Sequence, residues 1–412
     1  MPARKPALGF IFVTLVLDIL GIGLVVPILP KLIEEFQGHD TGRASQMYGL
    51  LASVYALMQF VFAPMLGSLS DKYGRRPVIL FSLLGSGLDY FVLAMAPNLA
   101  WFFVGRVISG ITGASFGTAT AYIADISPPE KRAANFGLVG AAFGLGFIIG
   151  PLLGGYLGDI NLHLPFYVAG SLTLLNWLYG LLVLPESVTD ATRGTFSWAK
   201  SNPFKSLVEL KRHPMLLGLA GTYFLLSMAQ QVYPSTWALY GSERYQWDPM
   251  ATGLSLAAVG LCAAIVQGGL TRRIVPKIGE PKAVVLGVAA STLAFTGYGL
   301  ASQGWMVYPL IVVGSLGGIT VPAVQAMISK TVNPDEQGSV QGSLTSLQSV
   351  AGVVGPLVAT GLFQHFLTTK PPVPGAAFFF SALLSLLAGW LAMKSFSRQR
   401  EIAAAEAKVH HP

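Results

Sequence analysis

Twelve stretches of mainly apolar residues follow one another along the chain, and this repetition constrains the fold more than any other feature. A helix needs about 20 apolar residues to cross a bilayer. The expected spans are 8–29, 47–67, 78–96, 100–123, 135–158, 165–184, 214–238, 249–270, 282–301, 305–329, 339–364 and 376–395. Charged residues make up 11% of the chain, against about 25% in soluble domains. The sequence therefore predicts an all-α polytopic membrane protein with twelve transmembrane helices.

Lysine and arginine are divided unevenly between the two sides of this arrangement. With the N-terminus in the cytoplasm, 21 of the 26 Lys and Arg residues lie in loops or tails on that side, and 4 lie on the other. Cytoplasmic loops of membrane proteins carry such an excess. We therefore expect both termini to be cytoplasmic, and the net charge of +7 needs no nucleic-acid partner.

The longest polar stretch divides the chain into two similar parts. We predict an N-terminal six-helix bundle at 1–184, a central cytoplasmic loop at 185–213, a C-terminal six-helix bundle at 214–395 and a cytoplasmic tail at 396–412. A shift of 205 residues places Gly150-Pro151 on Gly355-Pro356, and Lys72-Tyr73-Gly74 on Lys277-Ile278-Gly279. Such repeats predict two pseudo-symmetric bundles with a site at their interface near the membrane midplane.

Three motifs carry a resemblance to a known family. The segment 67–77 resembles the signature of the major facilitator superfamily. Its sequence is Gly67-Ser68-Leu69-Ser70-Asp71-Lys72-Tyr73-Gly74-Arg75-Arg76-Pro77. Gly105-Arg106-x-x-x-Gly110-x-x-Gly113 resembles its proton-coupling motif, and the run from Gly144 to Gly155 resembles its antiporter motif.

Within that superfamily the sequence is most similar to the tetracycline-resistance efflux proteins of Gram-negative bacteria. The similar segments are 18–24, 55–60, 122–126 and 184–187. The resemblance implies the major facilitator fold in a bacterial inner membrane. It also implies secondary active efflux of a drug-like organic solute, with tetracycline as a candidate, in exchange for protons by alternating access.

Three charged residues lie well inside predicted spans, away from the span ends: Asp18, Asp89 and Arg106. An ionisable group at bilayer depth costs several kcal/mol, from about 2.5 upward, unless it is paired or faces a polar cavity. We expect Asp18 and Asp89 to bind the coupled protons. We expect Arg106 to tune the pKa of these carboxyl groups and to contact the substrate. A structural ion pair that orients the helices is the alternative.

Four further residues are weaker candidates for the substrate cavity: Tyr55, Gln59, Gln267 and Gln325. Amide and phenol groups can hydrogen-bond a solute. Residues of these types also commonly face lipid or neighbouring helices.

The resemblance implies a cytoplasmic gate that closes the outward-facing state. Its residues here are Gly67, Asp71, Gly74, Arg75, Arg76 and Asp125. Anchoring of the loop by its positive charge is the alternative role.

Glycines recur every four residues in the fifth span, at Gly146, Gly150, Gly154 and Gly158. Small residues at this spacing let helices approach closely. With Pro151 and Gly155, we expect them to form a hinge whose contact with the partner half forms and loosens during transport. Static packing is the alternative.

The sequence departs from the tetracycline exporters in its second half. Their eighth-span histidine falls on Ala263 and their ninth-span aspartate on Ser291. Proton coupling must then depend on the N-terminal half. Recognition of a magnesium–tetracycline chelate is weakened, because hard cations prefer carboxylate oxygens.

Other functional classes fit the sequence less well. It contains no His-Glu-x-x-His pattern and no phosphate-binding Gly-x-x-x-x-Gly-Lys-[Ser/Thr] loop, so we expect no enzyme and no direct use of ATP. The single cysteine, Cys262, excludes a cysteine-based metal site. We expect a monomer in the lipid bilayer that needs no cofactor, with magnesium present only in a chelated substrate. A metabolite exporter, or an importer or uniporter of the same fold, stays open.

Overall fold

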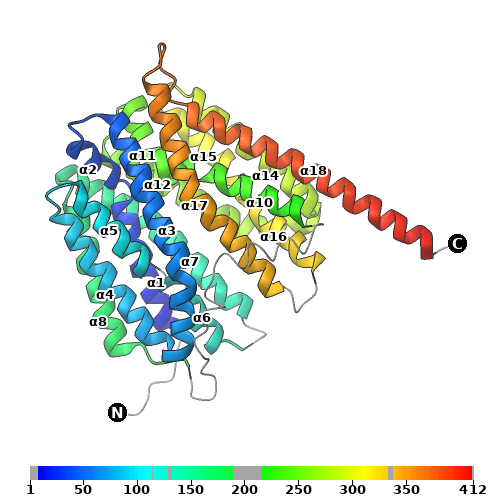
Figure 1. Cartoon of the computed structure of the whole chain (residues 1–412), viewed down its shortest axis with the longest axis horizontal. Helices are drawn as coiled ribbons and strands as arrows, with labels where there is room; N and C mark the ends of the chain where they lie inside the picture. The colour runs from blue at the N-terminus through cyan, green and yellow to red at the C-terminus, as the bar shows by residue number, and fades with distance from the viewer. Residues whose placement is uncertain (1–7, 114, 129–131, 189–215, 333–336, 411–412) are drawn as a thin grey trace.

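The computed structural model describes residues 8–113, 115–128, 132–188, 216–332 and 337–410, and the regular elements in these ranges are helices (Figure 1). The N-terminal half contains α1 (Leu8–Val25), α2 (Leu29–Phe36), α3 (Thr41–Tyr73), α4 (Arg75–Ala94), α5 (Leu99–Thr112), α6 (Ser115–Ile126), α7 (Arg132–Ile160) and α8 (Leu164–Val183). The C-terminal half contains α10 (Leu217–Gln230), α11 (Val232–Tyr245), α12 (Pro249–Ile265), η3 (Val266–Leu270), α13 (Thr271–Ile278), α14 (Glu280–Leu300), η4 (Gly304–Met306), α15 (Val307–Ser315), η5 (Leu316–Ile319), α16 (Thr320–Thr331), α17 (Gln337–Leu367) and α18 (Ala376–His410).

Within the described ranges, 11 helical segments are long and apolar enough to cross a membrane. The remaining predicted span, 214–238, is divided into α10 and α11, which have 14 residues each and meet at Gln231. The predicted all-helical class is therefore confirmed. The predicted loop at 185–213 lies outside the described residues except for 185–188.

Large apolar side chains are exposed along these helices. Phe81, Leu175, Leu293 and Trp390 are each more than half exposed. In a bilayer such positions contact apolar lipid, and the helices satisfy their own backbone hydrogen bonds. The chain is a multi-pass membrane protein.

The internal repeat is visible in the backbone. Gly74 separates α3 from α4 with a φ of +106°, and Gly279 separates α13 from α14 with a φ of +81°. Glycine adopts positive φ without the steric cost of a side chain. The two glycines are 205 residues apart, as the sequence alignment of the halves predicts.

The turns define two faces of the molecule. We call the face with the turns at Gly74 and Gly279 the basic face, because lysine and arginine residues lie next to both turns in the sequence. The other, here the opposite face, carries helix starts that are capped by Asp40, Asn98 and Asp248, whose side chains accept hydrogen bonds from backbone N–H groups. Such caps satisfy donors that the first turn of a helix leaves unpaired.

Buried side chains join the two halves toward the opposite face. Leu32 and Tyr48 of the N-terminal half belong to the same apolar cluster as Trp237, Tyr298 and Phe378 of the C-terminal half. Toward the basic face each half has its own cluster. One includes Leu15, Ile79 and Tyr122, and the other includes Leu219, Val284 and Ile328. The described halves therefore share a core at one face and have separate cores at the other.

Two crossings of helices from different halves lie in this joined region. On one side Gly253 of α12 faces the carbonyl of Pro151, and on the other Gly49 of α3 faces that of Pro356. Pro151 and Pro356 correspond in the internal repeat. The absence of a side chain on each glycine lets the backbones approach closely.

Hydrogen bonds reinforce the joined face. The Tyr48 hydroxyl donates to the Pro234 carbonyl at 2.7 Å, and the Lys31 Nζ donates to the Trp247 carbonyl, also at 2.7 Å. The Met250 N–H donates to Asp159 Oδ1 at 3.3 Å. Each bond joins one half to the other, so the opposite face is closed in this conformation.

We expect Gly49→Leu to separate α3 from α17 at the opposite face. A Cβ at Gly49 would lie 3.0 Å from the Pro356 carbonyl oxygen and would collide with the Thr360 hydroxyl, and backbone at a helix crossing has little room to shift. Spin labels on cysteines introduced at His39 and Gln246, with Cys262 replaced by alanine, would measure a longer distance between the halves.

The matched control is Gly361→Leu on α17, where an added Cβ has no atom within 4 Å. An unchanged label distance in Gly49→Leu, with the protein folded, would show that this crossing does not hold the face closed.

Candidate functional site

A buried acidic residue and an arginine face each other between α4 and α5. Asp89 is 1% exposed, and its Oδ2 lies 3.8 Å from the Arg106 Nη2. Gly105 makes this approach possible, because a Cβ there would lie 2.8 Å from the Asp89 Oδ1. In the described part of the chain, Asp89 Oδ1 and Arg106 Nε have no hydrogen-bond partner. The pair is therefore close and incompletely satisfied.

Two predicted cavity residues adjoin this pair. The Arg106 guanidinium lies over the Tyr55 ring, 5.7 Å from its centroid, within the range of a cation–π interaction. Gln59 Nε2 donates to the Tyr55 hydroxyl at 3.1 Å and to the Gly113 carbonyl at 3.2 Å. The structure thus brings together Tyr55, Gln59, Asp89 and Arg106, from three helices.

Asp18 approaches the same region from α1. It is half-buried and lies within electrostatic range of Tyr55 and Tyr90. Tyr90 is the residue next to Asp89 on α4. The three predicted ionisable residues therefore lie in one polar region of the N-terminal half.

The two predicted glutamines of the C-terminal half lie apart from that region. Gln325 Nε2 donates to the Tyr223 hydroxyl at 3.4 Å, and Tyr223 donates to Gln348 Oε1 at 3.1 Å. Gln267 lies in the π-helical segment η3 and packs beside Gly318. These are uncharged groups, which can hydrogen-bond a solute but carry no proton at ordinary pH.

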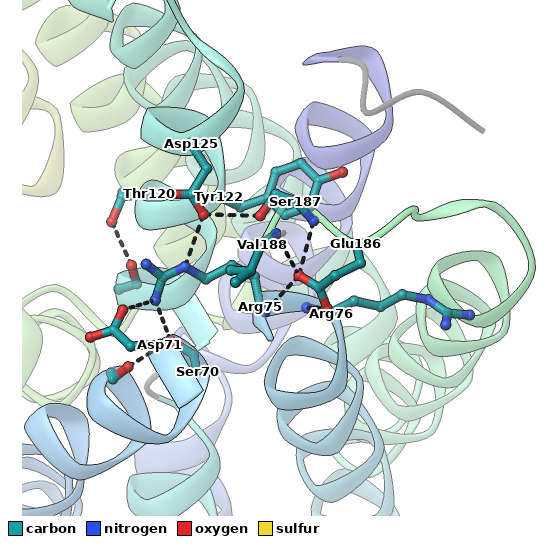
Figure 2. Close-up of polar contacts among 12 residues, drawn as sticks. Ser70, Asp71, Arg75, Arg76, Thr120, Tyr122, Asp125, Glu186, Ser187 and Val188 are labelled. Atoms are coloured by element: carbon teal, nitrogen blue, oxygen red, sulfur yellow. Dashed lines mark hydrogen bonds and ion pairs between the residues drawn. The ribbon is translucent and has the colours of Figure 1, made fainter. Parts of the chain in front are cut away.

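The predicted gate residues gather at the basic face, as Figure 2 shows. Arg75 Nη1 lies 2.5 Å from Asp71 Oδ1, and Arg75 Nε lies 3.0 Å from Asp125 Oδ2. The Arg75 Nη1 also donates to the Ser70 hydroxyl, which donates to the Gly67 carbonyl. These contacts join α3, α4 and α6, all of the N-terminal half.

Sequence reasoning assigned no role to Glu186, although it belongs to this cluster. Its carboxylate accepts hydrogen bonds from the backbone N–H groups of Arg75 at 2.9 Å and Arg76 at 3.2 Å, at the start of α4. It also accepts from the N–H groups of Ser187 and Val188. An anion at a helix N-terminus is stabilised by the unpaired N–H groups and the helix dipole. Glu186 therefore connects the segment after α8 to the turn between α3 and α4, within the signature segment 67–77.

Gly74 and Arg76, the remaining gate residues, also contact the segment at the end of α8. Gly74 leaves room for the Glu186 carboxylate, because a Cβ at Gly74 would collide with it. Arg76 Nη2 donates to the Leu181 carbonyl at 2.6 Å, and the Ser187 hydroxyl donates to Asp125 Oδ2 at 3.0 Å. The segment that leaves the N-terminal bundle is thus part of the cluster (Figure 2).

The antiporter-motif glycines require a correction. Gly146, Gly150 and Gly154 were expected to contact the partner half, but they pack against α1 of their own half, at Ile19, Gly23 and Leu24. Gly155 instead faces Pro249 and Met250 of α12. Successive helical residues point about 100° apart, so Gly155 and its neighbour Gly154 face different helices. Gly155 and the carbonyl of Pro151 lie against α12 of the partner half, and Gly158 lies beside Pro249 at the edge of the same contact.

Comparison with known proteins agrees with this architecture. The Major Facilitator Superfamily profile matches residues 11–356 and 277–408. The chain is 40% identical over 386 residues to the class C tetracycline resistance protein of Escherichia coli, with 93% of this chain and 97% of that protein covered. It is 41% identical over 351 residues to the class G tetracycline resistance protein of Vibrio anguillarum, with 84% and 88% covered.

Solved structures show the same helical arrangement. The human organic anion transporter MFSD10 matches with a TM-score of 0.71 and 26% identity, covering 94% of this chain and 100% of that one. The nucleoside transporter NupG matches with a TM-score of 0.75 and 14% identity, covering 94% and 99%. The second match is evidence for the fold alone.

We expect Glu186→Ala to destabilise the protein by about 2 kcal/mol, the order expected when hydrogen bonds to a charged group are lost. Thermal unfolding of the detergent-solubilised protein would measure the change. Glu35→Ala, at an exposed position on α2, is the control and should leave the unfolding midpoint nearly unchanged. Equal effects of the two substitutions would contradict a specific role for Glu186.

Proposed function

The chain belongs to the major facilitator superfamily, and we propose that it exports a drug-like organic solute from a bacterium in exchange for incoming protons. The observation that carries this proposal is the Asp89–Arg106 pair inside the membrane-spanning part of the N-terminal half. A carboxylate at such depth is costly, and intramembrane ionisable residues commonly mark ion or proton pathways. The high identity to tetracycline resistance proteins over most of the chain supports the direction of transport.

In the proposed orientation the basic face is cytoplasmic, as the excess of lysine and arginine favours. The protein would then lie in the inner membrane with both termini in the cytoplasm, acting as a monomer. Because the described halves join at the opposite face, this conformation would be the one that receives solute from the cytoplasm. Release would require the inter-half contacts of Tyr48 and Lys31 to break.

Proton binding would act through the charge balance of the pair. While Asp89 is ionised, it is the counter-charge of Arg106. For exchange, the solute and the proton would bind in turn: the solute would bind beside Tyr55 while Asp89 is ionised and paired with Arg106, and a proton would bind Asp89 after the solute has left. The transporter can then favour different conformations in the two protonation states, which is the requirement for coupled exchange. Asp18 would share in this proton binding, and no cofactor takes part.

Tetracycline is the first solute to test, on the strength of the identity to the class C and class G proteins. One observation favours a different solute. The positions at which the resemblance to the tetracycline-resistance family implies ionisable residues are Ala263 and Ser291 here, and the Tyr223 network of the C-terminal half is uncharged. A solute recognised by neutral hydrogen-bonding groups, without a bound magnesium ion, is the second candidate.

We expect expression in a drug-sensitive bacterium to raise the inhibitory concentration of at least one compound in a panel that includes tetracycline. Asp89→Asn should abolish the increase, because the amide cannot exchange a proton at ordinary pH. Growth assays and accumulation of the compound inside the cells would measure both effects.

The matched control is Asp40→Asn at the opposite face, where asparagine also caps a helix start. It should keep the resistance. Increased accumulation of a solute would instead indicate an importer, and unchanged accumulation of every compound would contradict drug export.

A further inference from the structure

The helices α4 and α5 are joined by two successive polar contacts. The hydroxyls of Ser86 and Thr112 lie 3.1 Å apart, and three residues further along α4 the Ser109 hydroxyl donates to Asp89 Oδ2. The two helices run antiparallel. Asp89 is three residues after Ser86 on α4, and its partner Ser109 is three residues before Thr112 on α5. This register places a hydroxyl directly opposite the buried carboxylate.

The Ser109 hydroxyl also contacts the arginine. Arg106 Nη2 donates to Ser109 Oγ at 3.3 Å, while the direct separation of Arg106 Nη2 from Asp89 Oδ2 is 3.8 Å. A direct charge-assisted hydrogen bond would have a length of about 2.7–2.9 Å. The carboxylate and the guanidinium are therefore joined through the serine hydroxyl, which donates to one and accepts from the other.

We propose that Ser109 is a positioning residue that holds the Asp89 carboxylate beside Arg106 and sets the pH at which it takes up a proton. This inference rests on the proposed exchange of solute for protons and adds a residue to it. The hydroxyl favours the ionised carboxylate, because it donates a hydrogen bond to that form. When a proton reaches Asp89, the same hydroxyl can turn and accept a hydrogen bond from it.

The other groups around Asp89 have different roles. Asp18 on α1 acts electrostatically, together with Asp89 and Arg106, on Tyr55 of α3 and Tyr90 of α4. From α8, uncharged Leu174 packs against α4 at Gly87. Among the described contacts, the hydrogen bond to Asp89 comes from Ser109.

The test measures protonation of Asp89 without transport. Purified full-length protein in lipid nanodiscs would be treated with dicyclohexylcarbodiimide, which reacts with protonated carboxyl groups in apolar surroundings, across a series of pH values. Mass spectrometry of the peptide that contains Asp89 would give the labelled fraction, with Asp89→Asn as the blank for that site.

We expect Ser109→Ala to extend the labelling of Asp89 to higher pH by about one pH unit, the order expected when the carboxylate loses a hydrogen-bond donor. Ser109→Thr keeps a hydroxyl at this position, so its labelling profile should match that of the wild type. Ser86→Ala removes the hydroxyl of the neighbouring contact between the same helices, so it should leave the profile unchanged.

A Ser109→Ala profile that coincides with the wild type would overturn the proposal, as would an equal shift in Ser86→Ala or the absence of labelling of Asp89 at every pH. The readout needs neither a solute nor a gradient. Failure to find any transported compound would therefore contradict the proposed export. The labelling profile of Asp89 would still support or reject the role of Ser109.

Discussion

An ionised carboxylate can lie deep in a membrane-spanning helix only if another group compensates its charge, and Asp89 has that group on the adjacent helix. The placement depends on Gly105, which lets Asp89 approach α5, and on Arg106 and Ser109, which lie on the same face of α5. Tyr55 and Gln59 then extend the polar region to α3. The polar region between α3, α4 and α5 is thus organised around the Asp89–Arg106 pair.

The C-terminal half repeats the fold without repeating the chemistry. Its backbone has the equivalent glycine turn at Gly279 and the equivalent proline at Pro356. Its polar network joins Tyr223, Gln325 and Gln348, which are uncharged. Duplicated bundles can therefore keep the same packing while one of them holds the ionisable groups. In the proposed mechanism, the N-terminal half binds protons and the C-terminal half contributes to recognition of the solute.

Much of this architecture could be predicted from the sequence, because apolar length and the glycine-proline pattern are local signals. The all-helical membrane class and the resemblance to the major facilitator superfamily are confirmed by the helices and by the family comparison, and eleven spanning helices are found in the described ranges. The partner of each helix face is not a local signal. The expected contacts of Gly146, Gly150 and Gly154 were wrong for that reason, since all three face α1. Ser109 and Glu186 received no role, because their partners become visible only when the register of α4 with α5 and the position of the end of α8 are known.

The most direct test of the central claim is proton movement in proteoliposomes that contain the purified protein and an entrapped pH-sensitive dye. A compound that the protein exports would be loaded into the lumen and diluted outside, with no initial pH difference. We predict that the lumen becomes more acidic as the compound leaves, because protons enter in exchange, and that liposomes without protein show no such change. Efflux of the compound through the protein with no change in lumenal pH would contradict proton-coupled exchange.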